Sequence, residues 1–98
     1  MDAVRELREL VEFRSETCGR HQYDEMTTQN ADGVIVYAAR VEFSSPLVRS
    51  YDSVTYHATF EEAKQDAALV ALVALRRRFH IAASAAPIKP LNDNRKST

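Results

Sequence analysis

The sequence has 98 residues, of which 45% are hydrophobic and 28% are charged, and its formal net charge is -1. This length suits one compact domain and leaves no room for a second, and the composition is typical of a globular protein rather than a disordered chain. The near-neutral charge lacks the basic excess of most nucleic-acid binders, because phosphate contacts supply much of their affinity, so any RNA binding would need a local basic patch.

The first predicted element is an amphipathic helix from Asp2 to about Glu16. Apolar residues recur there at helical spacing, with charged residues between them. Asp2 can cap the start of the helix, and Gly19 lies where such a helix commonly stops. These features predict a helix with one buried side.

Three strands are predicted next. The first spans Gln22–Thr28 and leads into the turn sequence Asn30–Gly33, whose residues tolerate positive φ. The second spans Val34–Phe43 and alternates, with one face formed by Ile35, Tyr37, Ala39, Val41 and Phe43. The third spans Ser50–Ala58, with Val54 and Tyr56 expected to face inward. We therefore expect an antiparallel meander.

A second helix is predicted to begin after Thr59, because Thr59 and Glu62 form a Thr-x-x-Glu capping box. It is expected to end at about Phe79, where three arginines suit the negative end of the helix dipole. The sequence thus predicts an α+β domain of α-β-β-β-α order over residues 1–80, with two helices on one face of a three-stranded antiparallel sheet. Residues 81–98 are expected to form a flexible tail.

Cys18 is the only cysteine, which excludes an internal disulfide and a cysteine-rich zinc site. The N-terminus does not resemble a signal peptide, and no apolar run is long enough to span a bilayer. We therefore expect an intracellular protein, cytoplasmic or nuclear, that does not contact membranes.

The order of elements and the second helix together resemble the double-stranded-RNA-binding domain. The family pattern Ala-Lys-x-x-Ala-Ala-x-x-Ala-Leu-x-x-Leu is met without a gap by Ala63, Lys64, Ala67, Ala68, Ala71, Leu72 and Leu75. The central strand's Phe-x-Val-x-Val is similar to Tyr37, Ala39 and Val41, and Tyr23 stands where a tyrosine usually opens the first strand. The family's Leu-Asn-Glu resembles Leu10-Val11-Glu12, which implies that Glu12 is a minor-groove contact; the alternative is a surface glutamate beside Arg8.

The departures from the family pattern lie in the regions that touch RNA. The family has Lys-Lys-x-Ala-Lys at the start of the second helix, where the lysines hold phosphates across a groove. The same five positions here are Phe60-Glu61-Glu62-Ala63-Lys64, so carboxylates stand where phosphates would bind. The hairpin's Gly-Pro-x-His is replaced by Asn30–Gly33, and the Gly-x-Gly-x-Ser before the helix becomes Thr55–Thr59. We expect the latter change to favour a longer, stiffer third strand. The sequence therefore resembles an altered member of the family.

Lysine-poor members of this family are often protein-association or dimerisation modules, and the resemblance implies an adaptor in RNA silencing or RNA processing. Leu69 and Val73 are apolar where the family pattern has polar residues, so they are candidates for contact with a protein partner or a second copy of the chain. The alternative is that they widen the contact with the first helix or lie singly exposed. The edge of the third strand could also pair with a partner, through Tyr51, Ser53 and Thr55.

A second hypothesis is a weak, shape-specific binder of double-stranded RNA. It would use Glu12, Lys64, Arg20, Arg40 and Arg49. The cluster Arg76–Arg78, with Lys89, Arg95 and Lys96, could add a basic surface, although such runs are usually solvated.

No catalytic, cofactor or metal site is expected, and no small-molecule substrate. The three histidines lack the spacing of metal ligands, and Glu61 and Glu62 point to different sides of a helix. Glycine is too scarce for a nucleotide-binding loop, and no nucleophile motif is present. We therefore expect a protein that is not an enzyme.

Overall fold

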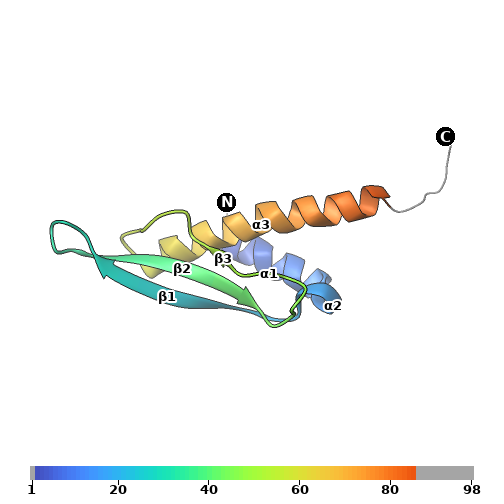
Figure 1. Cartoon of the computed structure of the whole chain (residues 1–98), viewed down its shortest axis with the longest axis horizontal. Helices are drawn as coiled ribbons and strands as arrows, with labels where there is room; N and C mark the ends of the chain where they lie inside the picture. The colour runs from blue at the N-terminus through green and yellow to red at the C-terminus, as the bar shows by residue number, and fades with distance from the viewer. Residues whose placement is uncertain (1, 86–98) are drawn as a thin grey trace.

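The computed structural model describes residues 2–85. Its elements are α1 (Ala3–Phe13), α2 (Ser15–Cys18), β1 (His21–Gln29), β2 (Ile35–Phe43), β3 (Tyr51–Asp52) and α3 (Phe60–Ala85). The strands form an antiparallel sheet in the order β1-β2-β3, α3 crosses one face of it, and α1 lies beside α3 (Figure 1). The predicted α+β fold with α-β-β-β-α order is confirmed.

The β1–β2 hairpin is the most regular part of the sheet. Nine residue pairs align, from His21 opposite Phe43 to Gln29 opposite Ile35. The turn forms as predicted: the Oδ1 of Asn30 accepts hydrogen bonds from the amides of Asp32 and Val34 at 2.9 and 3.1 Å, and Gly33 has a φ of 79°. The tip of this hairpin extends beyond the start of α3 (Figure 1).

The core lies between α1, α3 and the inner face of the sheet. Small side chains dominate the buried side of α3, so the helix can approach β2 closely. The fully buried residues of α3 are Ala63, Ala67, Ala68, Ala71, Leu72 and Leu75. They pack with Leu7 and Val11 of α1 and with Ala39 and Val41 of β2.

The N-terminal end of α1 is fixed by specific contacts. The carboxylate of Asp2 accepts a hydrogen bond from the Arg5 amide at 3.1 Å, as its predicted capping role requires. Gln65 of α3 adds a cap from another element, because its Oε1 accepts hydrogen bonds from the amides of Ala3 and Val4 at 2.8 and 3.3 Å. Helix N-termini leave such amides without intrahelical partners, so Gln65 satisfies α1 while tying it to α3.

The predicted third strand is wrong in extent and in orientation. Only Tyr51–Asp52 is strand, and a single bridge joins Tyr37 to His57 farther along. Val54 and Tyr56, expected to face inward, are 81% and 53% exposed. Between Asp52 and His57 the chain leaves the sheet, because the side chain of Asp66 on α3 accepts a hydrogen bond from the Val54 amide.

The helix boundaries also differ from prediction. The first helix breaks at Arg14, whose ψ of 38° is not helical, and the separate turn α2 places Cys18 fully inside the core. The guanidinium of Arg14 lies 4.7 Å from the centre of the Phe79 ring. The last helix continues past Phe79 to Ala85, since the following alanines favour helix. Residues 81–85 of the predicted tail are therefore helical, and residues 86–98 lie outside the described part.

Within residues 2–85, no helix is both long and apolar enough to cross a membrane.

Candidate functional site

The beginning of α3 is the place where a double-stranded-RNA-binding domain would hold phosphate, and here its polar groups already have partners within the chain. The hydroxyl of Thr59 accepts a hydrogen bond from the Glu62 amide at 3.2 Å, which confirms the predicted cap. The same hydroxyl donates to Oε1 of Glu62 at 3.3 Å. The carboxylate thus meets the capping hydroxyl instead of the Thr59 amide that a full capping box would use.

Lys64 matches one lysine of the phosphate-binding motif in the family that the sequence resembles, and its charge is balanced internally. Its Nζ lies 3.0 Å from Oε2 of Glu61. The ammonium also lies 5.2 Å from the centre of the Phe60 ring and 5.9 Å from that of Tyr23, within the range of cation–π attraction. Only 23% of the side chain is exposed. An incoming phosphate would have to compete with Glu61 for this lysine.

Asp66 holds the loop that precedes α3. Its Oδ1 accepts a hydrogen bond from the Val54 amide at 3.0 Å, and its Oδ2 accepts one from the Thr55 amide at 3.2 Å. The Nε2 of His57 lies 2.7 Å from the same Oδ2. Burial opposes ionisation of this carboxyl, but the hydrogen bonds from His57, Val54 and Thr55 outweigh it and lower the pKa of Asp66.

This arrangement places an internal anion where an external one would be expected. Consecutive backbone amides pointing to one spot make a binding site for an anion such as phosphate. At residues 54 and 55 that spot is filled by the Asp66 carboxylate, of which only 14% is exposed. With Lys64 balanced by Glu61, the carboxylates of Asp66 and Glu62 leave net negative charge near the start of α3, which disfavours the approach of a polyanion.

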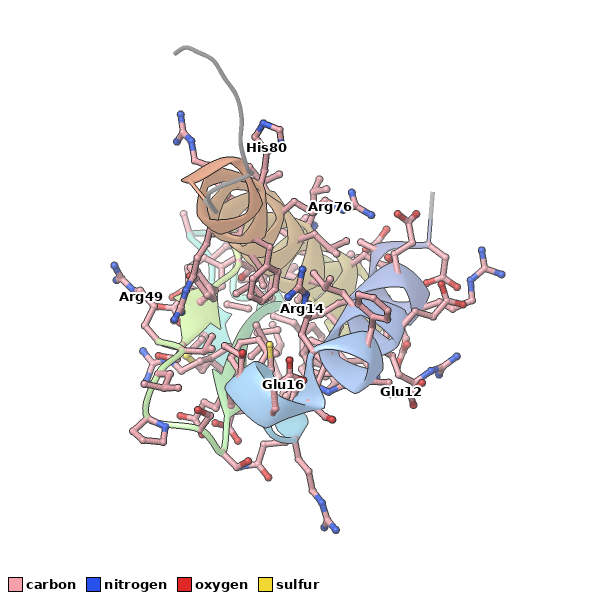
Figure 2. The ribbon with its side chains drawn as sticks, turned by 90° about the vertical axis from the view of Figure 1, so that its right-hand side faces the viewer. Glu12, Arg14, Glu16, Arg49, Arg76 and His80 are labelled. Carbon is pink, nitrogen blue, oxygen red and sulfur yellow. The ribbon has the colours of Figure 1, made fainter. Side chains whose placement is uncertain are left out.

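The other residues predicted to touch RNA do not form one surface. Glu12 and Arg20 come together, since both line an open hollow of about 400 Å³ between the end of α1 and the start of β1. In contrast, Figure 2 shows Glu12 and Arg49 on opposite sides of the molecule. Arg49 lies beside Tyr51, with its guanidinium 5.8 Å from the ring centre.

Arg40 belongs to the outer face of the sheet, the face turned away from the helices. It forms a bidentate salt bridge with Asp52 of β3, in which Nε and Nη2 of Arg40 donate to the two carboxylate oxygens at 2.7 and 3.3 Å. This pair holds the pKa of Asp52 below its ordinary value, chiefly through the hydrogen bond from Arg40. Arg40 is therefore occupied in a cross-strand contact, away from Lys64 and from Glu12.

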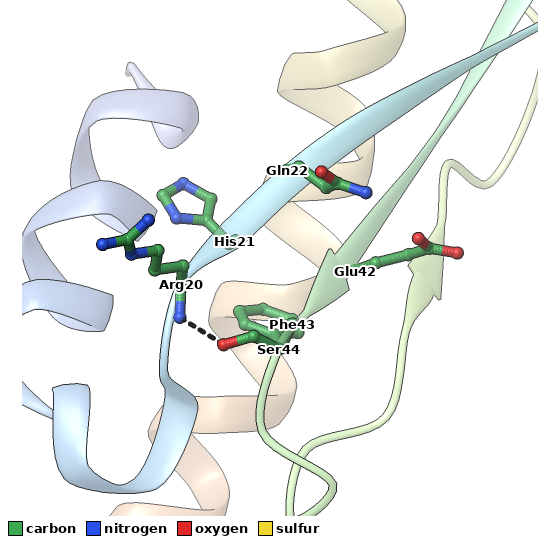
Figure 3. Close-up of a pocket in the computed structure, with 6 residues that line it drawn as sticks. All are labelled: Arg20, His21, Gln22, Glu42, Phe43 and Ser44. Atoms are coloured by element: carbon green, nitrogen blue, oxygen red, sulfur yellow. Dashed lines mark hydrogen bonds between the residues drawn. The ribbon is translucent and has the colours of Figure 1, made fainter.

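A second hollow lies at the end of the sheet where β1 starts and β2 stops (Figure 3). The rings of His21 and Phe43 stack there at 6.3 Å, and burial lowers the pKa of His21. Arg20 and His21 extend to one side of β1, whereas Gln22 and Glu42 extend to the other (Figure 3). The polar groups diverge, so the hollow does not present them to a common ligand.

The predicted partner contacts divide into two groups. Leu69 and Val73 of α3 are 43% and 61% exposed, so no described residue covers them fully. The edge residues are more engaged: Tyr51 packs edge-on against Phe43, and Ser53 is hydrogen-bonded to both the amide and the carbonyl of Ala39 at 3.1 and 2.8 Å. The amide of Thr55 is bound by Asp66. The third strand therefore offers a partner only a short edge.

Sequence reasoning missed Gln65, Asp66 and His57, which connect α3 to the chain before it. The available signal was the pair of polar residues at positions 65 and 66 within an alanine-rich helix. Residues 2–85 contain no cluster of histidine, cysteine and carboxylate side chains able to hold a metal ion. No model of a known protein family matches this chain, and no curated protein matches it.

Proposed function

We propose that this chain is a protein-association domain with the architecture of a double-stranded-RNA-binding domain, in which the phosphate-binding tip has become acidic and internally paired. The observation that carries the proposal is the state of that tip. Lys64 is paired with Glu61, and the amides of Val54 and Thr55 are bound by Asp66. Phosphate contacts supply most of the affinity of such domains for duplexes.

The outward side of α3 supplies the positive part of the argument. Leu69 and Val73 place two branched apolar side chains four residues apart on the same side of a helix, where each is at least two-fifths exposed. Apolar groups exposed side by side on a rigid element are typical of a protein-binding surface. The proposal makes the protein an adaptor rather than an enzyme, acting inside the cell.

A duplex-RNA binding assay tests the loss of RNA affinity. We expect no saturable binding of a duplex of about 20 base pairs, slightly longer than the roughly 16 that such domains span. The double variant Glu61→Lys, Glu62→Lys should restore measurable affinity, with a salt dependence that steepens by about 0.9 for each phosphate gained, the value for B-form DNA.

The matched control is Asp24→Lys, Glu42→Lys, which changes the net charge equally but places the lysines on the outer face of the sheet. If general charge alone attracts RNA, the control should bind as well as the tip variant. Saturable binding of duplex RNA by the unmodified chain, weakening steeply with salt, would overturn the proposed function and would support the second hypothesis, a weak RNA binder that uses Glu12, Lys64, Arg20, Arg40 and Arg49.

A further inference from the structure

The outward side of α3 carries a regular stripe, which we call the α3 seam. Its spacing alternates between four and three residues, the pattern of the positions that meet in a coiled coil. It consists of Glu62, Asp66, Leu69, Val73, Arg76 and His80. The fully buried alanines lie on the opposite side of the helix, so the seam faces away from the sheet. Figure 2 shows Arg76 and His80 on sides of α3 turned away from the sheet.

The charges of the seam are arranged in an order that complements itself. The acidic residues Glu62 and Asp66 come first, the apolar residues Leu69 and Val73 are central, and Arg76 follows. Reversing the direction of a second, identical helix would place its basic end against the acidic end of the first. A two-fold axis produces this arrangement, because it makes the same patch contact itself in opposite directions.

We infer that the partner of the α3 seam is a second copy of this chain, bound antiparallel about a two-fold axis that passes beside Ala71. This inference rests on the proposed function and specifies its partner. The register follows from the sequence: Leu69 meets Val73 of the second copy, Asp66 faces Arg76, and Glu62 faces His80. In heptad terms each of these contacts joins an a position of one helix to a d position of the other, as expected in an antiparallel coiled coil. The contact would run along roughly 27 Å of helix, from position 62 to position 80.

The existing contacts of the charged residues are compatible with this docking. Arg76 donates to Oε1 of Glu6 at 2.7 Å, but its side chain is half exposed, and a guanidinium has five N–H donors. Asp66 is largely enclosed by the loop at residues 54–57. It would therefore attract Arg76 of the second copy through its charge rather than through a direct contact. Its hydrogen bond to the Val54 amide holds the backbone of residue 54, whose side chain is 81% exposed, against α3 at Asp66.

Sedimentation velocity of the full chain over a wide dilution series tests the inference. We expect a concentration-dependent monomer–dimer equilibrium. Leu69→Glu should weaken the dimer by roughly a hundredfold or more, because two carboxylates would be buried without partners. His80→Glu should weaken it about fivefold, because it sets two carboxylates against each other on both sides of the axis, and Glu62→Lys should weaken it less, because it only removes the contact between Glu62 and His80.

The double variant Glu62→Lys, His80→Glu separates the antiparallel register from other arrangements. It recreates an opposite-charge pair only if position 62 faces position 80, so it should dimerise at least as well as the unmodified chain. A parallel dimer would place lysine against lysine and would be weakened further. Circular dichroism of every variant confirms folding before the comparison is made.

Two results would overturn the inference: a monomer at all concentrations, or a double variant weaker than both single variants. Neither result bears on RNA binding, so the duplex assay tests the proposed function separately. A monomer that binds no RNA would leave the seam covered by a different protein or by residues 86–98 of the same chain.

Discussion

Replacement of Asp66 by asparagine removes a charge without changing the shape of the side chain. In the structure both carboxylate oxygens accept hydrogen bonds, one from Val54 and the other from Thr55 and His57. An amide group has only one acceptor oxygen, so its NH₂ must face at least one backbone N–H. The loss of one charge-assisted hydrogen bond in a largely enclosed place should reduce the free energy of unfolding by about 2 kcal/mol.

The pH dependence of this loss follows from the lowered pKa of Asp66. Because the pKa is lower in the folded state than the ordinary value of 3.8, the carboxylate stabilises the fold fully above that value. The stabilisation disappears as the pH falls through the folded-state pKa, where both states become protonated. The free energies of unfolding of the variant and the unmodified chain, measured in urea, should therefore differ at pH 7, and the difference should shrink as the pH falls below 3.8.

The matched control is Asp32→Asn, the same chemical change at an exposed turn, which should alter stability by no more than about 0.5 kcal/mol. Equal free energies of unfolding for Asp66→Asn and the unmodified chain at pH 7 would refute the stabilising role of the hydrogen bonds to Asp66. A difference that does not shrink as the pH falls below 3.8 would also refute it.

Three further substitutions test the packing. Gly19→Ala should lower the free energy of unfolding by about 2 kcal/mol, because Gly19 has a φ of 70° and a Cβ there would collide with the hydroxyl of Ser44; a neutral result in urea unfolding would contradict this geometry. Leu72→Ala should lower the free energy of unfolding by about 2–5 kcal/mol, measured by thermal or urea unfolding, because it leaves a cavity in the core. A loss below about 1 kcal/mol would show that the side chain is not enclosed. Tyr23→Phe should stabilise the fold by about 1 kcal/mol, because the Tyr23 hydroxyl is buried without a hydrogen-bond partner among the described residues, and burial raises its pKa to about 12. A clear loss of stability in Tyr23→Phe would mean that the hydroxyl has a partner.

The parts of the fold that the sequence predicted correctly are those set by neighbouring residues. The turn depends on Asn30 and Gly33, the start of α3 depends on Thr59, and the alternation along β2 is local. The buried side of α3 is also a local pattern, since small and apolar residues recur there at helical spacing. Such features need no knowledge of what lies across the fold.

The features that could not be predicted depend on contacts between distant parts of the chain. The predicted third strand contained residues with high strand propensity, yet Asp66 takes the amides of Val54 and Thr55 and removes them from the sheet. Gln65 reaches back across more than sixty residues to cap α1. A single side chain that binds backbone amides can thus override local propensity.

The candidate site shows the same division. The acidic character of positions 61 and 62 is visible in the sequence, and the structure adds that Glu61 takes up the charge of Lys64. Of the residues proposed to contact RNA, Glu12 and Arg20 line one hollow, whereas Arg40 and Arg49 belong to other sides of the molecule. Positive residues scattered along a sequence do not reveal which of them share a face.

The alanine-lined side of α3 has a consequence for how this protein can change over time. Where a helix rests on a sheet through methyl groups, the distance between the two layers is fixed by main-chain atoms, and any larger side chain would push the layers apart. We therefore expect descendants of this chain to keep small residues at positions 63, 67, 68 and 71. Their variation should gather on the opposite side of the helix, where new recognition properties can be gained without disturbing the scaffold.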